Sequence, residues 1–293
     1  MLELHHVTKT FGDRRALDDV SITLSPGLTG FVGANGAGKT TTMRIIMGLL
    51  VPDAGELTWR GAPLATADRR AFGYMPEERG LYVKQPVREQ LVYFGRLHRM
   101  SAATAGRRAD ALLADFGLAD RAADKLEDLS LGNQQRVQIA VALMHEPVAL
   151  ILDEPFSGLD PEAVDAMAGR VRASAEAGVP VLFSSHQLDL VERLCDQVVI
   201  ISGGQIVAAG TPEKLRARGE TVIRVDAPAV EDWITTFDGV AVESTSPGSA
   251  RFTPVQAGAA DAVLRQALSR GSVTHFAEVT MPLSEIYREV VHS

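Results

Sequence analysis

The stretch that decides the fold is Gly33-Ala34-Asn35-Gly36-Ala37-Gly38-Lys39-Thr40-Thr41. Its spacing, Gly-x-x-x-x-Gly-Lys-Thr, is that of a phosphate-binding loop, in which glycines let successive backbone N–H groups point at one anion. The helix that begins at about Lys39 directs the positive end of its dipole to the same place. Lys39 supplies a charge for the outer phosphates, and the Thr40 hydroxyl can ligate magnesium. The stretch therefore predicts a site for a nucleoside triphosphate.

The segments on either side of the loop favour this interpretation. Residues 28–32 form a short apolar run that suits a buried strand, and residues 41–50 carry apolar side chains at helical spacing. An ordinary glycine-rich turn is the alternative. It is disfavoured because every fixed position of the motif is matched between a strand and a helix.

A second chemical motif follows the apolar run at residues 148–152. Five apolar residues in a row predict a central parallel strand that is buried on both faces. Asp153 and Glu154 come at its carboxyl end, where open α/β sheets place their ligands. Asp153 suits a magnesium-bound water, and Glu154 suits general-base work on an attacking water. A solvated acidic pair is the alternative, but it does not explain why so apolar a run ends so abruptly.

Two further residues are candidates through their neighbours. His186 ends another apolar strand, predicted over 180–186, and is a candidate for contact with a γ-phosphate. Phe11 lies about twenty residues before the loop and could stack on a nucleotide base. Each residue type, taken alone, is more often structural.

Composition bounds the possible functions. The chain has 293 residues, 46% hydrophobic and 23% charged, which is ordinary for a soluble globular protein of one large and one small domain. The net charge of -8 argues against nucleic acid as the main partner. The single cysteine, Cys195, excludes an internal disulfide and suits a reducing, cytosolic setting. We expect no signal peptide and no membrane span, so that any membrane role comes through a partner.

The hydrophobic pattern predicts two domains, an α/β domain over 1–218 and a small domain over 219–293. In the first, residues 2–7 alternate as an edge strand does, residues 9–12 suit a turn, and helices fill a subdomain at about 80–148. The small domain is predicted as strand, helix, strand, strand, helix, strand and a last helix over 283–291. The first six elements have the βαββαβ order of a ferredoxin-like fold, at residues 221–226, 228–237, 239–244, 250–255, 258–270 and 273–279.

Together these motifs resemble the ATP-binding subunit of ABC transporters. The resemblance covers residues 1 to about 218 and rests on five motifs in the order and spacing of that family: residues 33–41, 129–135, 153–154, 157–160 and His186. It implies an α/β P-loop NTPase domain with a mixed sheet core, an antiparallel β subdomain and a helical subdomain. An α+β ferredoxin-like domain follows it.

The resemblance also implies ATP and Mg²⁺ as cofactors and a role for each matching residue. Phe11 would stack on the adenine, Asp153 would support the magnesium, Glu154 would polarise the water and His186 would contact the γ-phosphate. Asp160 would contact the opposite subunit. The residues that would hold phosphates and magnesium are Gly33, Asn35, Gly36, Ala37, Gly38, Lys39, Thr40 and Thr41. A signature segment would act on the ATP of the partner through Ser130, Gly132, Asn133 and Gln134.

Two positions depart from the common pattern of the family. The signature is Leu-Ser-Leu-Gly-Asn-Gln-Gln, so Leu131 replaces a usual glycine and Asn133 precedes the expected glutamine, a variant that some ABC exporters share. Glu77 stands where a glutamine is expected, and its carboxylate can still reach magnesium. The segment around it, residues 75–82, is similar to that of drug-resistance and sodium-efflux exporters, which have a separate membrane protein. The C-terminal tail resembles the small extra domain of such subunits.

These similarities imply an ATP-hydrolysing subunit of an exporter. Two copies would pair head to tail as a homodimer. They would work in the cytoplasm, on the inner face of the membrane, through a separate transmembrane permease. A soluble ABC-type ATPase acting on ribosomes or DNA is the alternative, but such chains usually have two ATPase halves or a long coiled-coil insertion. A P-loop kinase would leave the signature segment and His186 without a role. The sequence does not identify the cargo.

Overall fold

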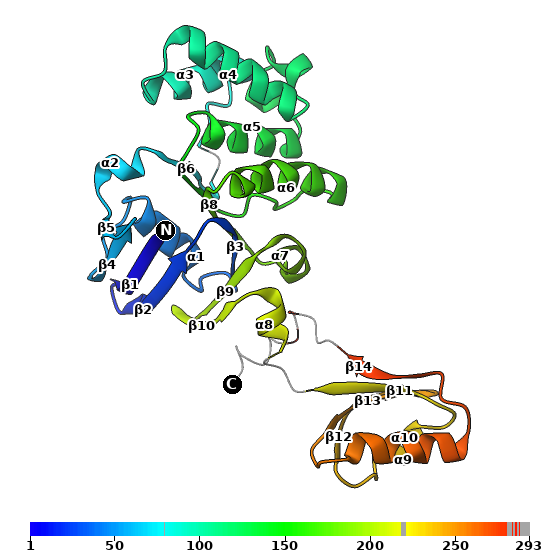
Figure 1. Ribbon diagram of the computed structural model, residues 1–293. Helices are drawn as coiled ribbons and strands as arrows, with labels where there is room; N and C mark the ends of the chain where they lie inside the picture. The colour runs from blue at the N-terminus through cyan, green and yellow to red at the C-terminus, as the bar shows by residue number, and fades with distance from the viewer. Residues whose placement is uncertain (79, 218–220, 280–282, 284, 286, 288–293) are drawn as a thin grey trace. The chain divides into compact units, whose positions relative to one another are not determined.

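The computed structural model describes the chain except for residues 79, 218–220, 280–282, 284, 286 and 288–293 (Figure 1). The chain divides into two compact units, Met1–Pro212 and Glu213–Ser293. The predicted domain boundary, after residue 218, falls at residues that the structure does not describe. The helix predicted over 283–291 likewise lies largely outside the described residues.

The first unit is built on a mixed six-stranded sheet of order β10-β9-β3-β8-β7-β6. Strands β9, β3, β8, β7 and β6 pair in parallel, and β10 is antiparallel to β9. Their bounds are Gly27–Val32 for β3, Phe72–Met75 for β6, Ala149–Leu152 for β7, Pro180–Ser185 for β8, Gln197–Ser202 for β9 and Gln205–Gly210 for β10. Because the parallel strands end at one edge, the residues that follow β3, β7 and β8 meet there.

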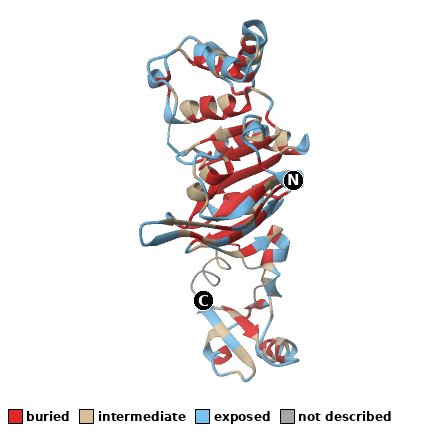
Figure 2. Cartoon of the chain, turned by 90° about the vertical axis from the view of Figure 1, so that its left-hand side faces the viewer, coloured by how far each residue is buried: buried red, intermediate tan, exposed pale blue. Residues whose placement is uncertain are grey.

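Every residue of β7 and β8 is buried, which confirms the prediction of central strands (Figure 2). The helix after the phosphate-binding loop, α1, covers Lys39–Ile46 and begins where the sequence predicts. Its apolar side chains pack into the core: Met43, Ile45 and Ile46 contact the same cluster as Phe31 of β3. This packing holds the helix N-terminus at the edge where the strands end.

A second, antiparallel sheet has the order β2-β1-β4-β5. Its strands are β1 (Leu2–Phe11), β2 (Arg14–Leu24), β4 (Ala54–Trp59) and β5 (Ala62–Pro63). The prediction of an edge strand at residues 2–7 is wrong, since β1 pairs with β2 on one side and β4 on the other. The predicted turn at 9–12 is also too early, because β1 continues to Phe11. Alternation reports which faces are buried, whereas the neighbours of a strand depend on long-range pairing.

Helices fill most of the chain between β6 and β7. They are α3 (Val87–Leu97), α4 (Ala102–Asp115), the 3₁₀ turns Ala119–Arg121 and Leu126–Asp128, and α5 (Leu131–Leu143). Ser101 caps α4, its hydroxyl accepting a hydrogen bond from the Thr104 N–H at 3.1 Å. The other helices of this unit are α2 (Thr66–Arg69), α6 (Pro161–Glu176) and α7 (Leu188–Leu194), and α8 (Pro212–Arg216) follows at the division.

The second unit has an antiparallel sheet of order β12-β13-β11-β14. Its elements are β11 (Val222–Asp226), α9 (Glu231–Ile234), β12 (Val240–Ser246), β13 (Ser249–Pro254), α10 (Ala259–Arg270) and β14 (His275–Val279). When the four strands are numbered in sequence order, their order across the sheet is 2-3-1-4. This order confirms the predicted ferredoxin-like arrangement. The helix predicted over 228–237 is shorter, and its residues Trp233 and Ile234 pack on Val225 and Phe252.

Two stacked histidines join the helical segment to the sheet of the first unit. The rings of His98, after α3, and His145, after α5, lie 3.7 Å apart and 5° from parallel. His145 Nε2 hydrogen-bonds the carbonyl of Phe72 in β6 at 3.2 Å. Burial, helped by the nearby His98, lowers the pKa of His145 to about 4, and burial also lowers the pKa of His98. Both rings are therefore neutral at pH 7.

The first unit should lose stability as the pH falls from 7 towards 4. Both folded pKa values lie below the ordinary value of 6.5. The unfolded chain therefore takes up protons first, and the free energy of unfolding falls by about 1–2 kcal/mol after allowance for partial exposure. Urea unfolding at several pH values can be followed by Trp59 fluorescence in a Trp233→Phe background, which leaves one tryptophan.

The matched variants are His145→Gln and, as control, His275→Gln in the other unit. His145→Gln should flatten the pH dependence that Trp59 reports, whereas His275→Gln should leave it unchanged. An unaltered pH dependence in His145→Gln would show that the histidine pair does not couple protonation to folding.

Candidate functional site

The phosphate-binding loop connects β3 to α1, and two of its glycines are required by close packing. A Cβ atom added to Gly33 would lie 2.4 Å from the Ile201 carbonyl oxygen. Gly38 has φ +118°, and a Cβ there would lie 2.7 Å from Leu17 Cδ2. Neither position can hold a larger residue without movement of the backbone. Close packing around the loop therefore requires glycine at both positions of the motif.

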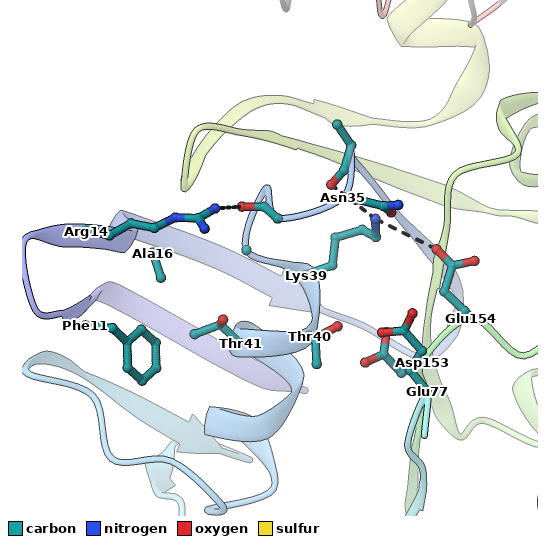
Figure 3. A pocket seen from close by; sticks show the side chains of 13 residues that line it. Phe11, Arg14, Ala16, Asn35, Lys39, Thr40, Thr41, Glu77, Asp153 and Glu154 are labelled. Carbon is teal, nitrogen blue, oxygen red and sulfur yellow. Dashed lines mark hydrogen bonds and ion pairs between the residues drawn. The ribbon is translucent and has the colours of Figure 1, made fainter. Parts of the chain in front are cut away.

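Lys39 lies almost fully buried inside the loop. Its Nζ atom donates a hydrogen bond to the Gly33 carbonyl at 2.6 Å and lies 3.8 Å from Glu154 Oε1. Figure 3 shows its side chain reaching from the start of α1 towards Glu154. The ammonium group is thus placed between the loop backbone and the acidic end of the site, where it can contact the outer phosphates of a nucleotide.

A cavity of about 520 Å³ opens in front of the loop. It brings together residues from β1, β2, the loop, the segment after β6 and the end of β7. Its lining residues are Phe11, Arg14, Ala16, Ala34, Asn35, Gly36, Gly38, Lys39, Thr40, Thr41, Glu77, Asp153 and Glu154. Ten residues predicted from the sequence line this one cavity, including Phe11 and Glu77.

Asp153 is held firmly by its neighbours. It is 1% exposed, its backbone N–H donates to the Met75 carbonyl at 2.8 Å, and its Oδ1 accepts from Ser184 Oγ at 2.6 Å. The other oxygen, Oδ2, is buried and has no hydrogen-bond partner in the part of the chain that the structure describes. A buried carboxylate oxygen without a partner is costly unless a cation or donor completes it.

Glu154 sits in an uncommon backbone conformation at the end of β7. Its φ is +51°, and its N–H donates to the same Ser184 hydroxyl at 2.7 Å. Its Oε2 lies 3.1 Å from His186 Nδ1. A left-handed conformation at a non-glycine residue stores strain and is often found at functional sites. Here it turns the carboxylate towards Lys39 and His186.

A hollow of about 350 Å³ continues the site beyond Glu154. It is lined by Asn35, Glu77, Glu154, Ser157 and His186. The His186 side chain is 53% exposed, whereas that of Glu154 is 12% exposed. The structure therefore joins the loop, the Glu77 segment and His186 around one carboxylate, as the sequence predicts.

The site residues fit Mg²⁺ as a cofactor. In the described ranges, no three Asp, Glu, His or Cys side chains cluster as a complete metal cage. Mg²⁺ commonly uses one or two carboxylates, waters and substrate phosphates instead. Figure 3 shows the Thr40 hydroxyl on the side of Asp153 and Glu77, so these side chains could share such an ion with a nucleotide.

The signature residues do not line this cavity. Ser130 caps α5, its hydroxyl accepting from the Asn133 N–H at 3.4 Å, and Gln134 Nε2 donates to the carbonyls of Leu126 and Leu129. Asp160 in turn caps α6 by accepting from the Ala163 N–H at 2.8 Å. Ser130, Gln134 and Asp160 thus each have a local structural role.

Leu131, one of the departures from the family pattern, lies beside the loop that follows Glu154. A Cβ added to Gly158 would lie 3.2 Å from Leu131 Cδ2, and one added to Gly132 would lie 3.2 Å from Leu159 Cδ2. Leu131 is 41% exposed, so its side chain lies partly against this loop and partly at the surface.

Three polar residues of the site were given no role from the sequence. Ser184 bridges Asp153 and Glu154, Arg14 lines the cavity, and Gln135 joins α5 to the carbonyls of Glu154 and Pro155 at 3.2 and 2.9 Å. Gln135 and Ser184 are buried polar residues. Burial of a polar side chain points to a hydrogen-bonding role, but the sequence alone does not show which polar residues are buried. Arg14 lies three residues after Phe11, and that short spacing is the one hint the sequence contains.

We expect Ser184→Ala to destabilise the first unit by about 1–3 kcal/mol, because it leaves the Glu154 N–H and an Asp153 oxygen without their partner. The measurement is urea unfolding followed by Trp59 fluorescence in the Trp233→Phe background. The control is Ser185→Ala, whose hydroxyl accepts one hydrogen bond, from the Gln187 N–H. Equal losses in the two variants would contradict a special role for Ser184.

Comparison with known proteins matches two family models. The model described as "ABC transporter" matches residues 17–157, and the model described as "ATP-binding protein DrrA1-3-like, C-terminal domain" matches residues 210–291. The first match contains the loop and the Asp153–Glu154 pair. The second covers almost the whole of the C-terminal unit.

Several relatives are similar over most of their length. The uncharacterized ABC transporter ATP-binding protein YhaQ of Bacillus subtilis is 40% identical over 83% of this chain and 86% of its own. The linearmycin resistance ATP-binding protein LnrL of Bacillus subtilis is 34% identical over 79% of this chain and 76% of its own. The Nod factor export ATP-binding protein I of Burkholderia lata is 38% identical over 73% of this chain and 72% of its own.

Solved structures agree. The structure of an ATP-binding subunit of an ABC transporter is 34% identical, with a TM-score of 0.68 over 74% of this chain and 92% of that one. The ADP conformation of MJ1267, an ATP-binding cassette of an ABC transporter, is 26% identical, with a TM-score of 0.65 over 73% and 92%. The chain therefore belongs to the ATP-binding proteins of ABC transporters, a family of ATPases, and has the ABC ATPase fold that its motifs predict.

Proposed function

We propose that this chain is the ATP-hydrolysing subunit of an ABC exporter and that it drives a separate transmembrane permease. The observation that carries the proposal is the single cavity lined by Phe11, the phosphate-binding loop, Glu77, Asp153 and Glu154. Export is supported by relatives whose names refer to linearmycin resistance and Nod factor export.

We assign a part of the reaction to each group. The loop N–H groups and Lys39 bind the phosphates, and Phe11 stacks on the adenine. Thr40, Asp153 and Glu77 would hold Mg²⁺, which would neutralise phosphate charge. Glu154 accepts a proton from the attacking water as general base. His186, 3.1 Å from Glu154, holds that carboxylate and contacts the γ-phosphate.

The loop site is half of a complete site. The signature residues lie outside the cavity of their own chain, so we propose that they close over the ATP of a second copy. In this head-to-tail homodimer the trans-acting residues are Ser130, Gly132, Asn133, Gln134 and Asp160. ATP favours the pair and hydrolysis releases it, which provides a two-state element for a permease.

The permease docks on the helical segment near residues 80–119 and the Glu77 segment. Large apolar side chains are exposed there: Tyr82 is 48%, Val83 51%, Tyr93 44% and Leu97 60% exposed. The rings of Tyr82, Tyr93 and Phe94 pack together. A cluster of this kind suits a protein interface better than open solvent.

The membrane is reached through that partner. In the described part of the chain no helix is long and apolar enough to cross a bilayer. We propose that the subunit works in the cytoplasm, on the inner face of the membrane, bound to the permease. Its ATPase domain spans residues 1–218, with the helical subdomain at about 80–148, and an accessory domain spans 219–293.

Glu154→Gln should retain ATP binding and lose turnover by about 10²-fold or more, because the amide cannot accept the proton from water. We expect the variant to accumulate as an ATP-bound dimer. The measurements are phosphate release and the mass of the full chain with Mg²⁺ and ATP by light scattering.

Lys39→Ala is the comparison for this experiment. It should lose nucleotide affinity itself and remain monomeric with ATP, because the charge at the outer phosphates is gone. Near-normal turnover in Glu154→Gln would refute the assignment of the general base, and normal ATP binding in Lys39→Ala would refute the loop site.

A tagged chain purified from its own membranes in mild detergent should carry a multi-span membrane protein. Tyr93→Ser with Leu97→Ser should reduce the yield of that protein by removing apolar contact area, whereas ATP binding should be unchanged. Recovery of ribosomes instead of a membrane protein would contradict the transport assignment.

A further inference from the structure

Arg14 is a second cation at the nucleotide cavity, and neither its spacing nor the family motifs assign it a role. It opens β2, three residues after Phe11. Its Nη2 atom donates a hydrogen bond to the Gly36 carbonyl of the loop at 2.9 Å. Figure 3 shows its side chain extending along the cavity to the loop, from the side on which Phe11 and Ala16 lie.

The charge of Arg14 is not neutralised by a neighbour. Nearby cations each have a carboxylate within 4 Å: Lys39 has Glu154 at 3.8 Å, and Arg15 has Asp18 at 2.7 Å. Among the residues that the structure describes, Arg14 makes one hydrogen bond, to a carbonyl, and no ion pair. A guanidinium has five N–H donors in a planar fork, so most of them are available to another acceptor.

The balance of charge in the cavity makes this cation important. The cavity is lined by three carboxylates, Glu77, Asp153 and Glu154, and by two cations, Lys39 and Arg14. Lys39 is already close to Glu154. Arg14 therefore supplies the positive charge that no neighbouring described carboxylate neutralises. This charge matters because the site must attract a polyanion to a protein of net charge -8.

The position of Arg14 indicates which part of the nucleotide it meets. Glu77, Asp153 and Glu154 lie at the other end of the view from Phe11 and Arg14 (Figure 3). Hydrolysis occurs at the end that holds Glu154, and the base lies against Phe11. Arg14, between Phe11 and the loop, is therefore nearest to the first phosphate after the ribose.

We propose that Arg14 binds the α-phosphate of the nucleotide through the guanidinium N–H groups that Gly36 does not use. The inference rests on the proposed nucleotide site. ATP and ADP have this phosphate in common, so Arg14 sets the affinity for substrate and product alike. It contributes little to the chemical step, because its contact is the same before and during hydrolysis.

The test is displacement of trinitrophenyl-ATP from the full chain, with Mg²⁺, by ATP, ADP and pyrophosphate. For Arg14→Gln we expect Kd to rise about ten-fold for both nucleotides, as for loss of a hydrogen bond to a charged group. Pyrophosphate can occupy the outer phosphate positions alone, so its affinity should fall less. The Kd values of Arg14→Lys should lie between those of the wild type and Arg14→Gln, because lysine keeps the positive charge but lacks the planar fork of N–H donors.

Arg15→Gln is the matched control, since this neighbouring arginine pairs with Asp18 and does not line the cavity. It should bind all three ligands like the wild type. Unchanged Trp59 fluorescence and an unchanged unfolding midpoint in the Trp233→Phe background will show that Arg14→Gln is folded.

Each other outcome has a distinct meaning. Equal weakening of pyrophosphate and ADP would overturn the proposal, because it would show that Arg14 only holds the loop through Gly36. Weakening of ATP without ADP would overturn it in favour of a γ-phosphate contact, and unchanged affinities would overturn it outright. Failure of the wild type to bind any nucleotide would instead refute the proposed site.

Discussion

The site depends on one buried hydroxyl that joins two carboxylate residues. Ser184 Oγ donates to Asp153 Oδ1 at 2.6 Å and accepts from the Glu154 N–H at 2.7 Å. It can do so because β8 and β7 are parallel neighbours that end at the same edge. The bridge holds Glu154 in its left-handed conformation, which turns the side chain to Lys39 and His186. Without this bridge, no hydrogen bond to Ser184 would hold the carboxylate of Asp153 and the backbone of Glu154 in their different orientations.

The cavity in front of this bridge has two chemically different ends. One end gathers Asp153, Glu154, Glu77 and the ammonium of Lys39. Under the proposed function, charge develops at this end during hydrolysis. The other end has Phe11 and Arg14, which suit a base and an inner phosphate. Under the proposed function and the proposed role of Arg14, binding and chemistry are separated along the nucleotide, and Arg14 sets the affinity for ATP and ADP without altering the hydrolysis step.

Local motifs were predictable from the sequence, whereas long-range partners were not. The loop, Asp153, Glu154 and His186 follow from residue types at the ends of apolar runs, and the fold class and ferredoxin-like order follow from the sequence of elements. The edge assignment of residues 2–7 was wrong because pairing with β4 joins residues far apart in the chain. Ser184 and Gln135 were missed because their partners lie about thirty and twenty residues away.

The central claim is that each chain holds half of two complete sites. The most direct measurement mixes Lys39→Ala, which lacks a working loop, with Asn133→Arg, which blocks the signature. In a mixed head-to-tail pair, the intact loop of one chain meets the intact signature of the other. We predict ATPase activity in the mixture well above the sum of the two inactive variants measured alone. Activity equal to that sum, in a mixture shown to contain mixed dimers, would contradict the account.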